Sequence, residues 1–111
     1  MSTDEEIIAE MNKLREKITS EKFARHFKNW TKTMQYHFTD TDEYWYIKLV
    51  NGQPEEPVKG KVEKPEIGYQ MTTADYFALM RDEIKGLKLY NQGRLKIKAA
   101  MPDIIKLQKL G

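Results

Sequence analysis

The spacing of hydrophobic residues changes near residue 33, and that change constrains the fold more than any other feature of the chain. Before it, apolar residues recur every three or four positions, as on one face of a helix, at Ile7, Met11, Leu14, Ile18, Phe23, Phe27 and Trp30. Ser2 and Thr3 precede Glu5 and Glu6 at the spacing of a capping box, and Thr19-Ser20 interrupts the pattern. We therefore expect two helical pieces between Thr3 and Trp30.

After residue 33 the apolar spacing is two, which is typical of strands that are buried on one side. It predicts a strand through Met34, Tyr36 and Phe38 and another over residues 44–50, with a turn at 40–42 between them. Asn51-Gly52 then favours a type I′ hairpin turn. Residues 53–64 contain two prolines, so a strand there is expected at a sheet edge.

The C-terminal third mixes both spacings. Alternation over residues 67–71 predicts a strand, and Thr72-Thr73 suits the N-cap of a helix that has Phe77, Met80 and Ile84 on its apolar face. Gly86 is expected to end that helix, and residues 87–92 to form a bridge. Residues 93–99 alternate again, and a last helix should begin at Pro102. The order predicts an α+β fold with a largely antiparallel sheet covered by helices on one side.

Size and composition predict one domain, residues 1–111, with a sizeable core. The net charge is only +2, yet residues 85–110 are strongly basic, which would suit an anionic membrane surface, an acidic headgroup or nucleic acid. Cysteine is absent, which excludes disulfides and fits a reducing compartment. The acidic N-terminus is unlike a secretory signal, and no apolar run approaches the ~20 residues of a membrane span. We therefore expect a cytoplasmic protein.

The residue types that carry catalysis are poorly arranged in this sequence. His26 and His37 have no third ligand near them in sequence, so we expect ordinary surface histidines and no metal site. Asp40, Asp42 and Glu43 lack the glycine and terminal glutamate of a calcium loop and suit a turn. No nucleophile elbow and no glycine-rich phosphate loop occurs. The chain is expected to be neither an enzyme nor the holder of a cofactor.

Large, adaptable apolar side chains are abundant instead. The chain has six methionines, six tyrosines, four phenylalanines and two tryptophans. Each of them taken singly is best explained as ordinary core. Together they suit an irregular apolar cavity, because unbranched methionine and flat aromatic rings can repack around a ligand.

Three segments resemble the sterol carrier protein 2 family. The first runs from Pro65 to Met80 and is a strand followed by a helix with Thr-Thr-Ala-Asp-Tyr-Phe at its start. The second is the strand Gly93-Arg-Leu-Lys-Ile-Lys-Ala-Ala-Met, and the third is the closing Lys106-Leu-Gln-Lys-Leu. The likeness over residues 34–64 is one of pattern, and residues 1–30 match only in helical character. The resemblance implies a five-stranded sheet with helices on one face, enclosing a tunnel for fatty acids, fatty acyl-CoA, sterols or phospholipids.

Carried over by position, the resemblance implies which residues line the tunnel. They are Trp45, Ile47, Leu49, Met71, Phe77, Met80, Leu89, Leu95, Ile97, Met101, Ile104, Ile105 and Leu107, with Gln108 as a polar contact. Ala99-Ala100 stands where the family usually has Gly-Asn or Gly-Asp, which would alter the turn into the last helix or the tunnel mouth. The ending Lys109-Leu110-Gly111 lacks the Ser-Lys-Leu type signal of peroxisomal members.

The sequence suggests two functions and makes a third one improbable. The leading one is non-catalytic binding and transfer of an apolar lipid or fatty-acyl ligand, with contact to a membrane surface as an accompanying expectation. The alternative is an accessory or scaffold protein that uses the same fold to assist a partner enzyme of lipid or lipid-soluble-cofactor metabolism. Nucleic-acid binding through Arg94, Lys96 and Lys98 is not expected, because the chain is near neutral and a solvated strand face explains these residues.

Overall fold

The computed structural model describes residues 3–110. The N-terminal residues with helical spacing form one long helix and one short helix in it. Helix α1 (Thr3–Thr19) has three acids in its first turn and is followed by the short α2 (Ala24–Phe27). The four apolar residues expected on one face of α1 are all buried. Ser2, half of the expected capping box, lies outside the described residues.

The sheet is built on the expected hairpin. Strands β1 (Lys32–Phe38) and β2 (Glu43–Val50) pair antiparallel. Asn51 and Gly52 both have positive φ, 52° and 81°, as a type I′ turn requires. The proline-rich stretch supplies only β3 (Gln53–Pro54) and β4 (Val58–Lys59), which both pair with β2 at the sheet edge. The expected edge position of this stretch is confirmed.

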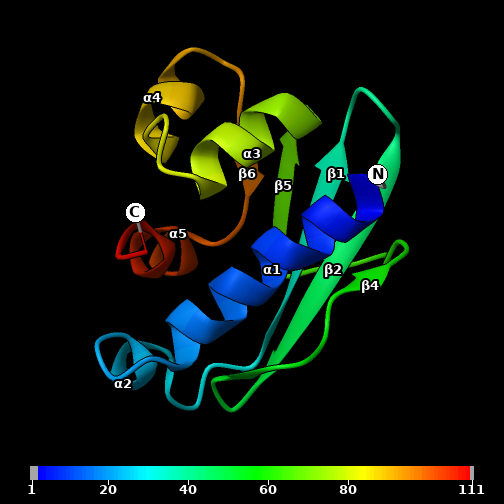
Figure 1. Cartoon of the computed structure of the whole chain (residues 1–111). Coiled ribbons are helices and arrows are strands. Elements are labelled where there is room, and N and C mark those ends of the chain that lie inside the picture. Colours follow the sequence, from blue (N-terminus) through cyan, green and yellow to red (C-terminus); the bar gives the residue numbers. More distant parts are fainter. Residues whose placement is uncertain (1–2, 111) are drawn as a thin grey trace.

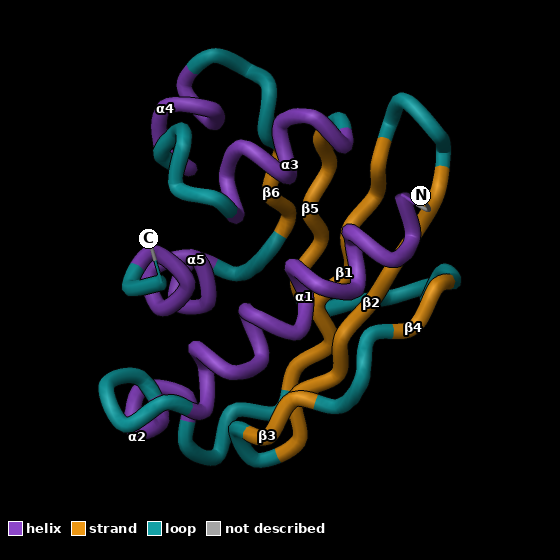
Figure 2. The backbone as a smooth tube through the Cα atoms, viewed as in Figure 1, coloured by secondary structure: helices purple, strands orange, loops and turns teal. Residues whose placement is uncertain are grey.

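The other side of β1 pairs with a strand far along the chain. Strand β5 (Ile67–Met71) lies parallel to β1, and β6 (Lys96–Lys98) pairs antiparallel with β5. The connection from β4 to β5 passes behind the sheet in Figure 2, on the side away from the helices. There the Val62 amide donates to the buried Gln35 side chain at 2.7 Å. The sheet is therefore mostly antiparallel, with one parallel pair and the order β3-β2-β1-β5-β6.

Helix α3 (Thr73–Met80) starts as expected, since the Thr72 hydroxyl accepts from the Asp75 amide at 3.1 Å. Its expected end at Gly86 is wrong. Asp82 takes φ 58°, and the Glu83 amide donates to the Ala78 carbonyl, which closes the helix in a Schellman arrangement that glycine usually provides. Gly86 instead opens α4 (Gly86–Asn91), within the stretch expected to be a bridge.

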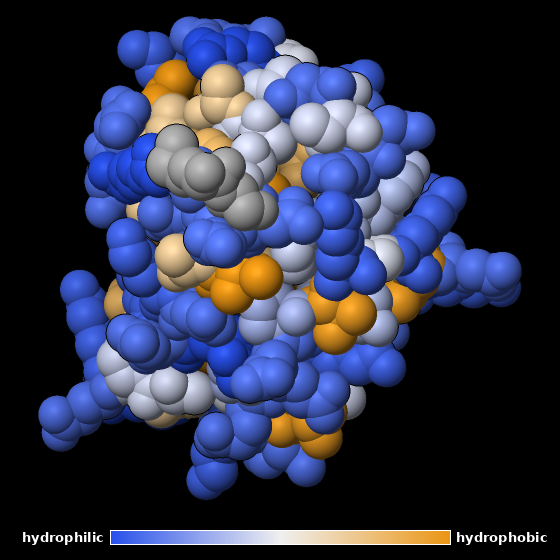
Figure 3. Space-filling view, turned by 45° about the vertical axis from the view of Figure 1, so that its right-hand side comes forward, coloured by the Kyte–Doolittle hydropathy of each residue, from blue (hydrophilic) through white to orange (hydrophobic). Residues whose placement is uncertain are grey.

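The last strand is shorter than expected, three residues, because Gly93 has φ 74° and the chain turns before Lys96. Helix α5 (Met101–Gln108) carries Pro102 in its first turn, as expected. All five helices lie on one side of the sheet, with α3, α4 and α5 toward its β5–β6 end (Figure 1). The surface turned forward in Figure 3 is mainly hydrophilic, with small separate apolar areas.

Candidate functional site

The sheet face that meets the helices is apolar, and the strand register decides which side chains share it. One row across the sheet consists of Trp45, Tyr36, Tyr69 and Ile97, because these residues are direct partners in neighbouring strands. A second row consists of Ile47, Met34 and Ile67. We call these residues the inner layer, together with Leu49, Phe38, Met71, Leu95 and the helical side chains packed on them. It is the main apolar region in which a ligand could be held.

Three tyrosines belong to the inner layer and are linked through the ring of Tyr36. The Tyr36 and Tyr69 rings stack at 4.8 Å, while the Tyr76 ring meets Tyr36 edge-on at 5.5 Å and Phe38 at 5.0 Å. Burial raises the pKa of all three hydroxyls well above their ordinary value of 10.0, and Glu10 adds to the rise at Tyr76. The layer therefore presents neutral hydroxyl groups at physiological pH.

Most of the residues expected to line a tunnel fall in this layer. The six that are buried are Trp45, Ile47, Leu49, Met71, Leu89 and Leu95. The four that are partly buried and packed against them are Phe77, Met80, Ile97 and Leu107. The structure thus brings ten expected residues together in one cluster.

The remaining four expected residues lie on α5, outside that cluster. Ile104 is half-buried and Gln108 is exposed. Met101 is 65% and Ile105 is 55% exposed. As placed here, these four side chains form no wall against the inner layer, so a lining role for them stays a prediction.

Sequence reasoning did not include Tyr36, Tyr69 and Tyr76 among the lining residues. The two strand tyrosines follow from alternation with Met34 and Met71, once the register is known. Tyr76 is completely buried, whereas Phe77, which was expected on the apolar face of the helix, is only half-buried. The signal for Tyr76 is weak, because α3 is eight residues long and apolar on most sides.

Three buried polar atoms near or within the inner layer have no hydrogen-bond partner among the described residues. They are the Tyr76 hydroxyl, the Trp45 indole nitrogen and the Oε1 atom of Glu10. The other oxygen of Glu10 accepts from Arg81 Nε at 3.3 Å. Leaving such groups unpaired costs about 1–3 kcal/mol each, so they are natural partners for a polar group inside the protein.

The two histidines lie near the surface beside other charged or aromatic side chains. His37 stacks on Tyr44 at 4.2 Å and contacts Asp42 through Nε2 at 2.8 Å. The pKa of His26 is lowered by burial of its ring and by the nearby cations Lys109, Arg25 and Lys106. Within residues 3–110 no group of three or more His, Asp or Glu side chains is arranged to hold a metal ion.

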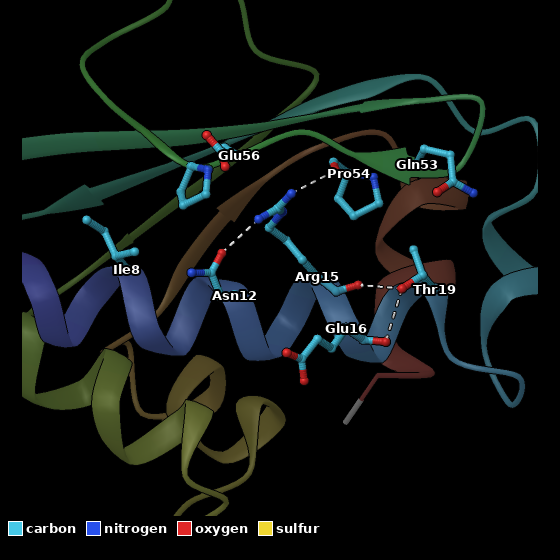
Figure 4. Close-up of a pocket in the computed structure, with 9 residues that line it drawn as sticks. Ile8, Asn12, Arg15, Glu16, Thr19, Gln53, Pro54 and Glu56 are labelled. Atoms are coloured by element: carbon cyan, nitrogen blue, oxygen red, sulfur yellow. Dashed lines mark hydrogen bonds between the residues drawn. The ribbon is translucent and has the colours of Figure 1, made fainter.

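Two hollows open on the surface beside α1 and β3. The larger, of about 620 Å³, runs between α1 and the β3 segment (Figure 4). Arg15 crosses it, donating to Asn12 at 2.8 Å and to the Pro54 carbonyl at 3.4 Å. The smaller, of about 230 Å³, adjoins it at Thr19 and Gln53. Both linings are mixed polar and apolar, and neither includes a residue expected to line the tunnel.

Helix α5 is attached to the rest of the molecule largely by polar contacts. Asp103 is its buried residue; it accepts from the Trp30 indole at 3.2 Å and pairs with Lys32 at 3.4 Å. Lys106 donates to the His26 carbonyl, and the Leu110 carbonyl accepts from Lys17 at 2.5 Å. Apolar burial, the main stabilising term for most helices, contributes less here.

This arrangement defines a small α+β domain whose helices and mixed sheet enclose one apolar layer. A comparison with protein families matches residues 11–110 to the SCP-2 sterol transfer family. The match covers most of the chain, and the chain belongs to that family. The resemblance drawn from the sequence is thereby confirmed.

Solved structures share the fold at low sequence identity. Palmitated SCP2L2 from Aedes aegypti is similar over 99% of this chain and 94% of its own, with 13% identity and a TM-score of 0.71. The UbiJ-SCP2 ubiquinone synthesis protein is similar over 99% of this chain and 92% of its own, with 11% identity and a TM-score of 0.64.

A third solved structure contains the fold as a small part of a larger protein. The stereoselective inverting sec-alkylsulfatase Pisa1 from Pseudomonas sp. is similar over 77% of this chain, with 16% identity and a TM-score of 0.63. The chain spans only 13% of that protein. A comparison with curated proteins finds no match.

Proposed function

We propose that the chain binds an apolar lipid in the inner layer, between the sheet and helices α3 to α5, and transfers it without chemical change. The observation that carries this proposal is the inner layer itself, which combines stacked tyrosines with the adaptable side chains Met34, Met71 and Met80. Membership of the SCP-2 sterol transfer family supports it. We propose neither a cofactor nor a catalytic step.

The free energy available suits a carrier. Burying one CH₂ group contributes ~0.8 kcal/mol, and association costs at least ~4 kcal/mol. A fatty-acyl chain of about twelve carbons therefore gains enough to bind and still to be released. The Tyr76 hydroxyl and the Trp45 indole would offer hydrogen bonds to a polar group of the ligand.

Entry of a ligand requires the inner layer to open, and α5 is the element best suited to move. Its polar contacts with residues 17–32 can break and re-form in water at little net cost, unlike the burial of a large apolar surface. Movement of α5 would also bring Leu107 and the α5 residues left outside the cluster into contact with the ligand. The expected lining role of Met101, Ile104, Ile105 and Gln108 belongs to that opened form.

The test is uptake of a fluorescent fatty acid, followed by fluorescence titration and by native mass spectrometry of gently purified protein. Ile97→Trp adds volume to the inner layer and should weaken binding on the order of tenfold. Val58→Trp, at an exposed position of the sheet edge, is the matched control and should bind as the unaltered protein does. Urea unfolding of both variants separates lost binding from lost folding.

Two results would end the proposal. One is an unaltered protein that takes up no fatty acid at micromolar concentration. The other is equal binding by Ile97→Trp and Val58→Trp when both are folded, because the ligand would then lie elsewhere. The surface groove crossed by Arg15 would be the next place to examine.

An accessory role is the second candidate. It is favoured by the similarity to a ubiquinone synthesis protein over nearly the whole of both chains. In that role the chain would assist a partner enzyme. The expected cytoplasmic location would give it access to soluble enzymes. Recovery of one enzyme in stoichiometric amount, with no exchangeable lipid, would favour this function over transfer. The Arg94 side chain pairs with Asp75 at 2.5 Å, which agrees with the expectation that it does not contact nucleic acid.

A further inference from the structure

Exposed apolar side chains are concentrated on two neighbouring helices in sequence. Leu87 and Tyr90 on α4 are 63% and 53% exposed, and Met101 and Ile105 on α5 are 65% and 55% exposed. The other large apolar side chains that are exposed among residues 3–110 are Ile8, Val50 and Val58, at 37–43%. The four most exposed therefore all belong to α4 and α5.

Their spacing puts each pair on one side of its helix. Leu87 and Tyr90 are three residues apart, and Met101 and Ile105 are four apart, so each pair projects in nearly one direction. Both helices lie toward the β5–β6 end of the molecule (Figure 1). A group of exposed apolar side chains with polar residues around it is typical of an interaction site.

The charge around these helices is positive. Residues 85–110 contain seven basic residues and a single acid. The acid, Asp103, is buried and paired with Lys32. The exposed basic residues on the helical side are Lys85, Lys88 and Lys109. Arg94 is paired with Asp75, and Lys96 and Lys98 lie on the opposite face of the sheet because they alternate with the inward-facing Ile97. Asp82 and Glu83, which precede this segment, are the nearest exposed acids in sequence.

Helix α2 extends the positive region. Arg25 lies close enough to Lys106 and Lys109 for all three to act on His26, whose pKa is lowered. Lys106 also donates to the His26 carbonyl, which fixes α5 against α2. Cations from α2 and from the C-terminal segment thus lie close together around His26.

We propose that α4 and α5 form a docking surface for an anionic lipid bilayer. This inference rests on the proposed function and names where a lipid carrier would meet its donor or acceptor membrane. Leu87, Tyr90, Met101 and Ile105 enter the interfacial region, while the surrounding lysines contact anionic headgroups. A bilayer is favoured over a protein partner because it accepts separated apolar anchors within a diffuse positive field and needs no fixed complementary shape.

The surface also adjoins the proposed route of the ligand. Met101 and Ile105 lie on the helix whose polar contacts must open, and Leu107 of the same helix packs on the inner layer. Insertion of α5 into a bilayer would move the Met101 and Ile105 side chains from water into lipid, and it would favour the form in which α5 has moved away from the inner layer. Docking and ligand exchange would then occur at one place.

Vesicle co-sedimentation tests the docking surface directly. Vesicles of phosphatidylcholine with about 30% phosphatidylserine should bind the protein, and vesicles of phosphatidylcholine alone should bind it on the order of tenfold less. High salt should weaken the binding. Met101→Asp and Leu87→Asp, one on each helix, should each lower partitioning on the order of tenfold. Val50→Asp and Val58→Asp are the controls, since both residues are exposed and lie on β2 and β4.

Each contrary result overturns the proposal. No binding to anionic vesicles, equal binding to neutral ones, or an equal effect of the controls would do so. So would a dimer in analytical ultracentrifugation that Met101→Asp dissociates, because α5 would then face a second copy of the chain. Failure here with normal fatty-acid uptake in solution would leave the proposed function standing, whereas loss of uptake with vesicle binding retained would remove the proposed function instead.

Discussion

Gly52 lies where the turn after β2 meets the backbone of Phe27. Its φ of 81° favours glycine, and a Cβ atom there would lie 2.5 Å from the Phe27 carbonyl oxygen. Gly93 also has a positive φ, 74°, but an added Cβ would meet nothing within 4 Å. A side chain at Gly52 would therefore cause both backbone strain and steric overlap, whereas one at Gly93 would cause backbone strain alone.

Gly52→Ala is expected to destabilise the protein by about 3 kcal/mol, because strain and overlap with a backbone atom add together. Gly93→Ala should cost only about 1–2 kcal/mol, since it introduces the strain alone. Urea unfolding followed by circular dichroism gives both values. Equal costs for the two variants would show that the backbone at Phe27 yields without penalty. The Asn-Gly pair predicted the turn at Gly52, but the contact with Phe27 depends on how α2 packs, which no local pattern contains.

At the level of elements, one buried carboxylate, that of Asp103, links α5 to Trp30 and Lys32. Asp103→Ala leaves the Trp30 indole without its acceptor and Lys32 without its partner. We expect a loss of about 1–3 kcal/mol in stability and faster amide hydrogen exchange in α5. Glu83→Ala, at an exposed position of the loop between α3 and α4, is the control. Unchanged exchange in α5 of the Asp103→Ala variant would show that apolar contacts hold the helix.

Elements with a strong apolar repeat were predicted well, and elements without one were not. Helix α1, the β1–β2 hairpin and the Thr72 cap follow from spacing and cap chemistry. Helix α4 was missed because Gly86 normally ends helices, while here the aspartate at position 82 takes the left-handed conformation first. A non-glycine residue in that role leaves no distinctive signal in the sequence.

For the whole molecule, the sequence predicted the composition of the candidate site better than its shape. Alternation and the family resemblance placed ten of the expected residues in one cluster. The stacked tyrosines depend on the parallel register of β1 and β5, which two separate strand patterns do not specify. The exposure of Met101 and Ile105 depends on how α5 docks, which is a tertiary property.

The tyrosines of the inner layer make the stability of the whole core sensitive to alkaline pH. Because the folded-state pKa values of Tyr36, Tyr69 and Tyr76 are raised above 10.0, the folded protein holds these protons where the unfolded chain releases them. The stabilisation is complete below the unfolded value and is lost as the pH rises above it. Urea unfolding between about pH 8 and 11 should show this fall.

Tyr76→Phe provides the matched variant for that experiment. It removes one titrating group, so the alkaline loss of stability should be shallower. It also removes a buried hydroxyl that has no partner among the described residues, so stability at neutral pH should be unchanged or higher by about 1 kcal/mol. A clear loss at neutral pH would mean that this hydroxyl is hydrogen-bonded in solution.

The parallel pairing of β1 with β5 also determines the order in which the chain can fold. The β1–β2 hairpin is local and can close in about 1–10 μs, whereas β5 joins β1 only after the chain has passed around β2 and across the back of the sheet. Until that step is complete, one side of β1 has no partner and Tyr36 has no ring to stack on. The long excursion through the proline-rich edge strands, rather than any helix, is therefore expected to set the folding rate of this molecule.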